Sequence, residues 1–157
     1  MMNKEQVLAK MREKGAEDAL ALQTKAIAGE VTHTEIIDQE ISVPAFDPNK
    51  DYSTWGINSP VADEGQVWLL LQPHNASHYE GRPSTLRALW GLAHTKNPEN
   101  AKPYVAPFGT SGLYQEEECC TDPNYEDPTQ VFVCRVRDNA YSPSEYMQNW
   151  EKYTPTV

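Results

Sequence analysis

The sequence is poor in cysteine and has no long apolar run. Its three cysteines, Cys119, Cys120 and Cys134, are an odd number, so at least one has no partner within the chain. They match no paired zinc motif and argue against a disulfide scaffold, while the sequence leaves open whether Cys134 faces Cys119 or Cys120 across two strands. No run approaches a membrane-spanning length, and the charged N-terminus lacks the apolar core of a signal peptide. We therefore expect a protein that is made in a cytoplasm and does not enter a membrane.

Basic residues are also scarce, since 13 Lys and Arg stand against 23 Asp and Glu and give a net charge of −10. A surface of that sign repels phosphate groups, so we expect neither nucleic acid nor an anionic membrane as a partner. No Ser/His/Asp or Cys/His arrangement and no phosphate-binding glycine loop stands out. The acidic run at 116–118 is typical of a solvated face rather than of a catalytic pair of carboxylates. We expect no enzymatic activity and no cofactor.

The N-terminal part favours helix. Residues 3–28 carry a broken apolar face, and Gly29 is a suitable stop. The sequence THTE at 32–35 matches a capping box and predicts a second short helix that runs to about Glu40. This arm, residues 1–42, has little apolar area for its length. Two interpretations stay open: the arm docks on another protein or on further copies of itself, or it packs on the rest of its own chain or frays.

After the arm, the pattern favours short strands separated by turns. Apolar runs at 66–71 and 130–136 are bounded by Gly, Pro, Asn or Asp, and ADEG at 62–65 predicts a hairpin. The remaining segments are expected to be a linker at 43–51, one or two helical turns at 84–94 and a proline-rich connector at 96–109.

Two stretches of this second part repeat one pattern, in which an aromatic precedes a proline and a tryptophan follows that proline by seven residues. We expect two small antiparallel β modules, at 43–102 and 103–157, and an α+β fold overall. Modules of this size have little core, so the four large aromatics Trp68, Trp90, Phe132 and Trp150 are expected to form it. The corresponding positions are Tyr52 and Tyr114, Val61 and Cys120, Trp68 and Phe132, Tyr79 and Tyr141, Pro83 and Pro143, and Trp90 and Trp150.

These stretches resemble the small chitin- and cellulose-binding modules of carbohydrate-binding families 5 and 12. The likeness lies in LQPH at 71–74, ALW at 88–90 and YSPSEYMQNW at 141–150, and it spans roughly residues 47–94 and 107–153. In that family the aromatic just before the proline is implicated in stacking on sugar, which implies this role for Tyr79 and Tyr141. This chain departs from the family in having Tyr rather than Trp at both positions, and its second copy lacks the QPH.

The neighbours of these tyrosines are suited to bind sugar hydroxyls. The C–H face of a sugar ring packs on an aromatic ring, and polar side chains beside it supply hydrogen bonds. The alternative is that both tyrosines lie over the edge of the core. His74 and His78 are four residues apart, but Pro73 favours a loop and no third ligand is evident, so we expect no metal site. The candidate contacts besides Tyr79 and Tyr141 are Trp55, His74, Asn75, Arg82, Asn139 and Tyr146.

An N-terminal helical arm followed by such modules is also similar to small structural proteins of tailed phages of Gram-positive bacteria. That resemblance implies a virion protein on a tail, fibre or capsid that attaches to cell-surface polysaccharide. Its arm would join other virion proteins or further copies of the chain, for example in a trimer. Two other functions stay open: structural decoration of the virion without sugar binding, and the accessory binding region of a glycan hydrolase.

Overall fold

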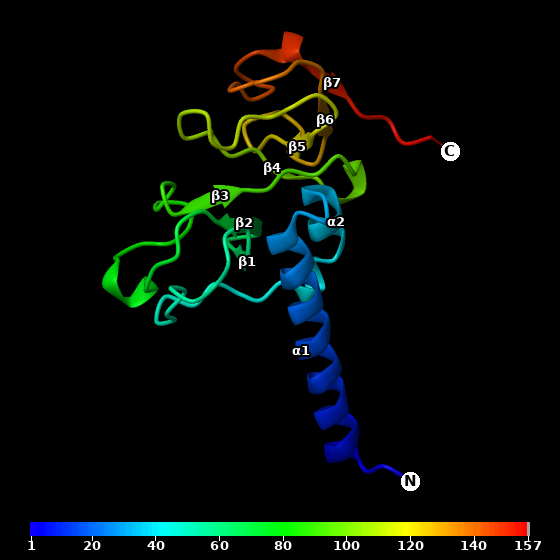
Figure 1. Cartoon of the computed structure of the whole chain (residues 1–157). Helices are drawn as coiled ribbons and strands as arrows, with labels where there is room; N and C mark the ends of the chain where they lie inside the picture. Colours follow the sequence, from blue (N-terminus) through cyan, green and yellow to red (C-terminus); the bar gives the residue numbers. More distant parts are fainter. Residues whose placement is uncertain (157) are drawn as a thin grey trace.

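The computed structural model describes residues 1–156, and it has the expected α+β fold: an N-terminal helix followed by two small sheets (Figure 1). The helical elements are α1 (Lys4–Ala28), α2 (His33–Asp38) and the short 3-10 turns η1 (Glu40–Ser42), η2 (Ala76–His78), η3 (Pro98–Asn100) and η4 (Met147–Asn149). The strands are β1 (Pro60–Asp63), β2 (Gln66–Leu70), β3 (Trp90–Leu92), β4 (Lys102–Pro103), β5 (Cys119–Thr121), β6 (Val131–Cys134) and β7 (Trp150–Lys152).

Both predicted helices form, and their ends are set by local hydrogen bonds. Asn3 caps α1 in a capping box, and Gly29 ends it in the left-handed conformation at φ 70°. The Thr32 hydroxyl accepts a hydrogen bond from the Glu35 backbone, and the Glu35 carboxylate accepts one from the backbone N–H of Thr32. The predicted capping box of α2 is therefore confirmed, and this helix ends at Asp38, two residues earlier than expected.

The helical arm packs on the body at its C-terminal end only. At its C-terminal end, Leu22 and Ala26 are buried together with Ile36 and Ile37 of α2 against the first sheet. Its N-terminal part extends away from the body, with the chain terminus at the far end (Figure 1). The interpretation that the arm packs on its own chain is therefore correct for the last turns of α1 and wrong for the first ones.

The first sheet has the order β1-β2-β3 and is antiparallel throughout. Its centre, β2, is buried on both faces, because Val67 and Leu69 contact the helices while Trp68 and Leu70 face a cluster of aromatic residues. The predicted hairpin joins β1 to β2, and Glu64 and Gly65 at its turn both have positive φ, as a tight two-residue turn requires.

The second sheet repeats the pairing of the first, as the internal repeat predicts. Val61 pairs with Trp68 and Leu70 with Trp90, while Cys120 pairs with Phe132 and Cys134 with Trp150. Tyr52 and Tyr114 are both buried, and each lies edge-on to the last tryptophan of its module at ring distances of 5.2 and 5.3 Å. The four aromatics expected in the core are all buried: Trp68, Trp90, Phe132 and Trp150.

Three segments differ from the sequence-based expectation. The segment 43–51 is irregular but is not a free linker, because Val43 and Phe46 are buried and Ala45 bridges to Ala62. Residues 90–92 form strand β3 rather than helical turns. The connector 96–109 contributes β4, which lies parallel to β5, so the predicted module boundary after residue 102 falls inside a strand.

The two sheets contact each other directly. Thr95, just after β3, forms a β-bridge with Cys119 of β5. The ring of His94 stacks on that of Tyr114 at 3.7 Å, and the Gln66 side chain donates to the carbonyl of Pro103. The first and the second module thus form one continuous body.

All three cysteines are buried free thiols, so neither of the pairings left open for Cys134 forms. Cys120 lies opposite Phe132 in the sheet. Burial raises the pKa of the Cys119 thiol to about 12 and raises that of Cys120 as well. Thiols held in the protonated form are poor nucleophiles, so these side chains serve the core. In residues 1–156, no helix has the length and apolar character needed to cross a bilayer.

Candidate functional site

Tyr79 lies on the surface of the first module, and core aromatic residues hold it from below. The residue is 45% exposed, and its ring stands edge-on to the ring of His74 at 5.4 Å. His74 in turn stands edge-on to Trp90 at 5.5 Å. An exposed aromatic ring that rests on the core loses little conformational freedom when a ligand packs against it.

The loop that carries Tyr79 is built by its own polar residues. The Asn75 side chain caps η2 by accepting hydrogen bonds from the Ser77 backbone N–H at 3.0 Å and from the Ser77 hydroxyl at 2.6 Å. His74 is 7% exposed, and its Nδ1 donates to the carbonyl of Gln72 at 2.7 Å. Two predicted sugar contacts, His74 and Asn75, therefore act first in shaping the loop.

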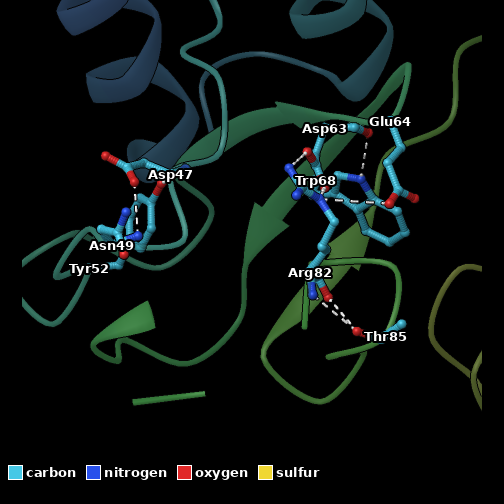
Figure 2. Close-up of polar contacts among 8 residues, drawn as sticks. All are labelled: Asp47, Asn49, Tyr52, Asp63, Glu64, Trp68, Arg82 and Thr85. Atoms are coloured by element: carbon cyan, nitrogen blue, oxygen red, sulfur yellow. Dashed lines mark hydrogen bonds and ion pairs between the residues drawn. The ribbon is translucent and has the colours of Figure 1, made fainter. Parts of the chain in front are cut away.

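Arg82 is directed to the β1–β2 hairpin. Its guanidinium makes a two-pronged contact with Asp63, with Nε–Oδ2 at 2.8 Å and Nη2–Oδ1 at 2.6 Å (Figure 2). The Arg82 backbone N–H donates to the Thr85 hydroxyl, which closes the turn around Pro83 (Figure 2). Arg82 thus fastens this turn to the hairpin through Nε and Nη2, while its side chain stays 47% exposed.

Trp55 is half-buried and forms part of the same aromatic cluster. Its ring packs edge-on against Tyr52 at 4.8 Å, and the Lys50 ammonium lies 5.2 Å from the ring centre. The Tyr52 hydroxyl accepts a hydrogen bond from the backbone of Asp47, which fixes the start of the module (Figure 2). Trp55 is therefore only partly accessible to a ligand.

In the second module, two tyrosines lie side by side on the surface. Tyr141 is 54% exposed and Tyr146 is 44% exposed, and their rings are 5.9 Å apart at an angle of 49°. The Tyr141 carbonyl accepts a hydrogen bond from the indole of Trp150, so this pair too is tied to the core. Tilted rings of this kind form a shallow two-walled surface on which one ring can stack on a sugar and the other can contact its edge.

Asn139 lies beneath this pair and is 2% exposed. Its carbonyl oxygen accepts hydrogen bonds from the Tyr141 backbone and the Asn149 side chain, and its amide nitrogen lies 3.4 Å from the sulfur of Cys134. Its predicted role as a sugar contact finds no exposed atom to act through, and it orders the loop under Tyr141 instead.

The sequence did not point to the contact between the modules. His94 is buried, its Nε2 donates to the carbonyl of Gly112 at 2.8 Å, and burial lowers the pKa of its imidazole to about 4. Tyr104 packs on the other tyrosine of this region, Tyr114, at 5.4 Å. The sequence gives no sign that His94 joins the two modules, because its partners Gly112 and Tyr114 lie about twenty positions further along the chain.

Within residues 1–156, no group of three or more His, Cys, Asp or Glu side chains is placed to hold a metal ion. The acidic run at 116–118 is partly paired, since Glu117 and Arg135 form an ion pair at 2.8 Å. Burial raises the pKa of Glu118, whose carboxylate accepts from the Gln115 backbone. The arrangement offers exposed aromatic side chains on ordered loops.

Comparison of the chain with known protein families and with curated proteins finds no match.

Proposed function

We propose that this chain is a non-enzymatic binding protein of a phage virion, on a tail, fibre or capsid, and that its two modules contact cell-surface polysaccharide through Tyr79 and Tyr141. One observation carries the proposal: both modules expose a tyrosine just before the proline turn, and in both it is tied to the core tryptophan, through the His74 ring for Tyr79 and through the backbone carbonyl for Tyr141. The resemblance of these stretches to carbohydrate-binding families 5 and 12 supports the same assignment.

The second module is the stronger of the two surfaces. Tyr141 and Tyr146 provide two exposed rings, and the Tyr146 hydroxyl donates to the Gln148 side chain, which holds it in place. Tyr79 is a single ring, and the Asn75 side-chain oxygen and the His74 Nδ1 beside it already form hydrogen bonds within the loop. We therefore assign weak binding to each module and the larger share to the second.

The virion assignment rests on the arm. The first turns of α1 extend from the body and expose apolar side chains, as a segment that joins other virion proteins or further copies of the chain would. In this proposal the protein is made in the host cytoplasm and is then built into the particle.

Structural decoration without sugar binding is the second candidate, and a specific observation favours it. The polar residues next to the tyrosines are used inside the protein, with Arg82 held by Asp63, Asn139 buried and Asn75 capping η2. Few fixed hydrogen-bonding groups then remain to select one sugar.

Binding to a glycan array, to chitin beads and to purified Gram-positive cell walls separates the two candidates. We expect retention by the wild-type protein on at least one of these, weakened about tenfold by Tyr141→Ala and further by adding Tyr79→Ala. Phe108→Ala is the matched control, since Phe108 is 57% exposed but lies outside both loops. Retention that is unchanged in the double variant would refute the stacking role, and no retention by the wild type would favour decoration.

A further inference from the structure

One side of α1 is buried near its C-terminal end and uncovered near its N-terminal end. Leu22 and Ala26 are 3% and 5% exposed against the first sheet. Met11 precedes Leu22 by eleven residues, or about three turns, and Val7 precedes Met11 by one turn, so all four lie on one side. Val7 and Met11 are 40% and 64% exposed. Gly15 and Asp18 lie between Met11 and Leu22 on the same side, so the stripe is partly apolar, and its N-terminal end at Val7 and Met11 is uncovered.

This uncovered stripe borders a groove of about 450 Å³. Ile41 of η1, which is 100% exposed, lines the end of the groove nearer the body. Gly15 also lines the groove, and a Cβ added there would meet no atom within 4 Å, so another helix could approach closely at that point. Apolar side chains line the groove together with the charged Lys10, Lys14 and Asp18, a mixture that suits the face of an amphipathic helix.

Charge divides the molecule into two unequal parts. Residues 1–14 contain four basic and two acidic side chains, a net charge of +2. The other nine basic and 21 acidic residues give the rest of the chain a net charge of −12. The acidic body of a second copy therefore attracts the basic free end of α1. The basic free end of that second copy repels it.

We propose that the groove is occupied by α1 of a second copy, with the two helices antiparallel. A two-fold axis near Met11 brings Val7 of each copy opposite Gly15 of the other and Lys4 opposite Asp18. Asp18 already pairs with Lys14 of its own helix at 2.9 Å, so the second copy adds a further cation to an existing pair. A parallel pair would instead place the two +2 ends together and the two −12 bodies together. The charges thus select a dimer with its bodies at opposite ends.

This inference rests on the oligomerising role proposed for the arm and is independent of sugar binding. Light scattering of the purified full chain therefore tests it without any glycan. We expect twice the 17.7 kDa mass of the chain at concentrations of about 100 µM, a range in which weak dimers form. A monomeric mass, or a trimer, would overturn the proposal, whatever the glycan experiment shows.

Met11→Asp places a charge at the centre of the pairing and is expected to weaken dimerisation by at least about 100-fold. Leu20→Asp is the matched control, because Leu20 is 63% exposed but lies nine residues, two and a half turns, from Met11 and so on the opposite side of α1. The helical circular dichroism of both variants shows whether α1 is still formed. A dimer that survives Met11→Asp as well as it survives Leu20→Asp would contradict the assignment of the groove.

Disulfide trapping tests the direction of the pairing. Lys4→Cys and Asp18→Cys proteins are mixed and oxidised gently, with the wild type as control, since its three thiols are buried. An antiparallel pair yields mainly the disulfide between the two different variants. A product made mainly of Lys4→Cys homodimers would show a parallel pair and refute the proposal.

Discussion

At the scale of single residues, Arg82 and Asp63 form the clearest unit. The carboxylate of Asp63 belongs to a side chain that is only 7% exposed, and the Arg82 guanidinium supplies both of its close cationic contacts. Their contact joins the turn before β3 to the β1–β2 hairpin. A nearly buried carboxylate that loses such a partner keeps its desolvation cost.

We expect Arg82→Ala to lower the free energy of unfolding by more than Glu64→Ala does, because it leaves the nearly buried Asp63 carboxylate without its partner. Glu64→Ala is the control: Glu64 is half-exposed and lies 3.7 Å from the same guanidinium, so its loss should cost less than about 0.5 kcal/mol. Urea unfolding of the three proteins measures both values. Equal stabilities of Arg82→Ala and the wild type would show that the contact contributes nothing.

The sequence predicted the apolar residues of the site better than its polar ones. Large aromatics in a small module have no other place to be buried, so the sequence predicts Trp68 and Trp90 in the core, where they lie. The burial of His74 and Asn139 could not be foreseen, since it depends on loop hydrogen bonds to particular carbonyls and amides. The same polar residue types shape a loop or contact a ligand, so residue type alone does not distinguish the two roles.

At the scale of elements, α1 shows where local signals stop being informative. Its start at Lys4 and its end before Gly29 follow from capping chemistry, which depends only on nearby residues. How much of α1 packs on the body depends on where the first sheet ends, which no local sequence pattern predicts. The parallel strand β4 has no local sequence signal for the same reason, because its two residues become a strand only beside β5.

Leu22→Ala is expected to lower the free energy of unfolding by about 3 kcal/mol, because Leu22 is 3% exposed in the contact between α1 and the first sheet. Leu20→Ala, in the exposed face of the same helix, should change it by less than about 0.5 kcal/mol. Chemical unfolding followed by tryptophan fluorescence gives both numbers. Similar losses in the two variants would mean that the end of α1 does not pack as described.

At the scale of the whole molecule, the contact between the modules contains a titratable group. The pKa of His94 is lowered to about 4 by burial, with His33 and Arg87 as nearby cations that act in the same direction. The unfolded chain therefore binds a proton at His94 below its ordinary pKa of 6.5, while the folded chain does not until about pH 4. The contribution of neutral, buried His94 to the free energy of unfolding is therefore complete above about pH 6.5 and is lost as the pH falls toward 4.

We expect the free energy of unfolding to fall between pH 7 and pH 5 by an amount on the order of 2 kcal/mol from His94 alone. His94→Gln should remove most of this pH dependence, although it lowers stability at pH 7. His78→Gln, at an exposed position, should leave the dependence as in the wild type. Urea midpoints at the two pH values provide the measurement, and a wild type with equal stability at both would contradict the assignment.

The small strand β4 has a consequence for any attempt to divide the protein. It covers one edge of β5 with residues that follow directly from the first module, and Lys102 within it also donates to the carbonyl of Gly65 in the β1–β2 turn. A fragment that began at residue 103 would keep only part of this cover. It would present unpaired backbone groups along β5, which is a template for intermolecular strand pairing and aggregation.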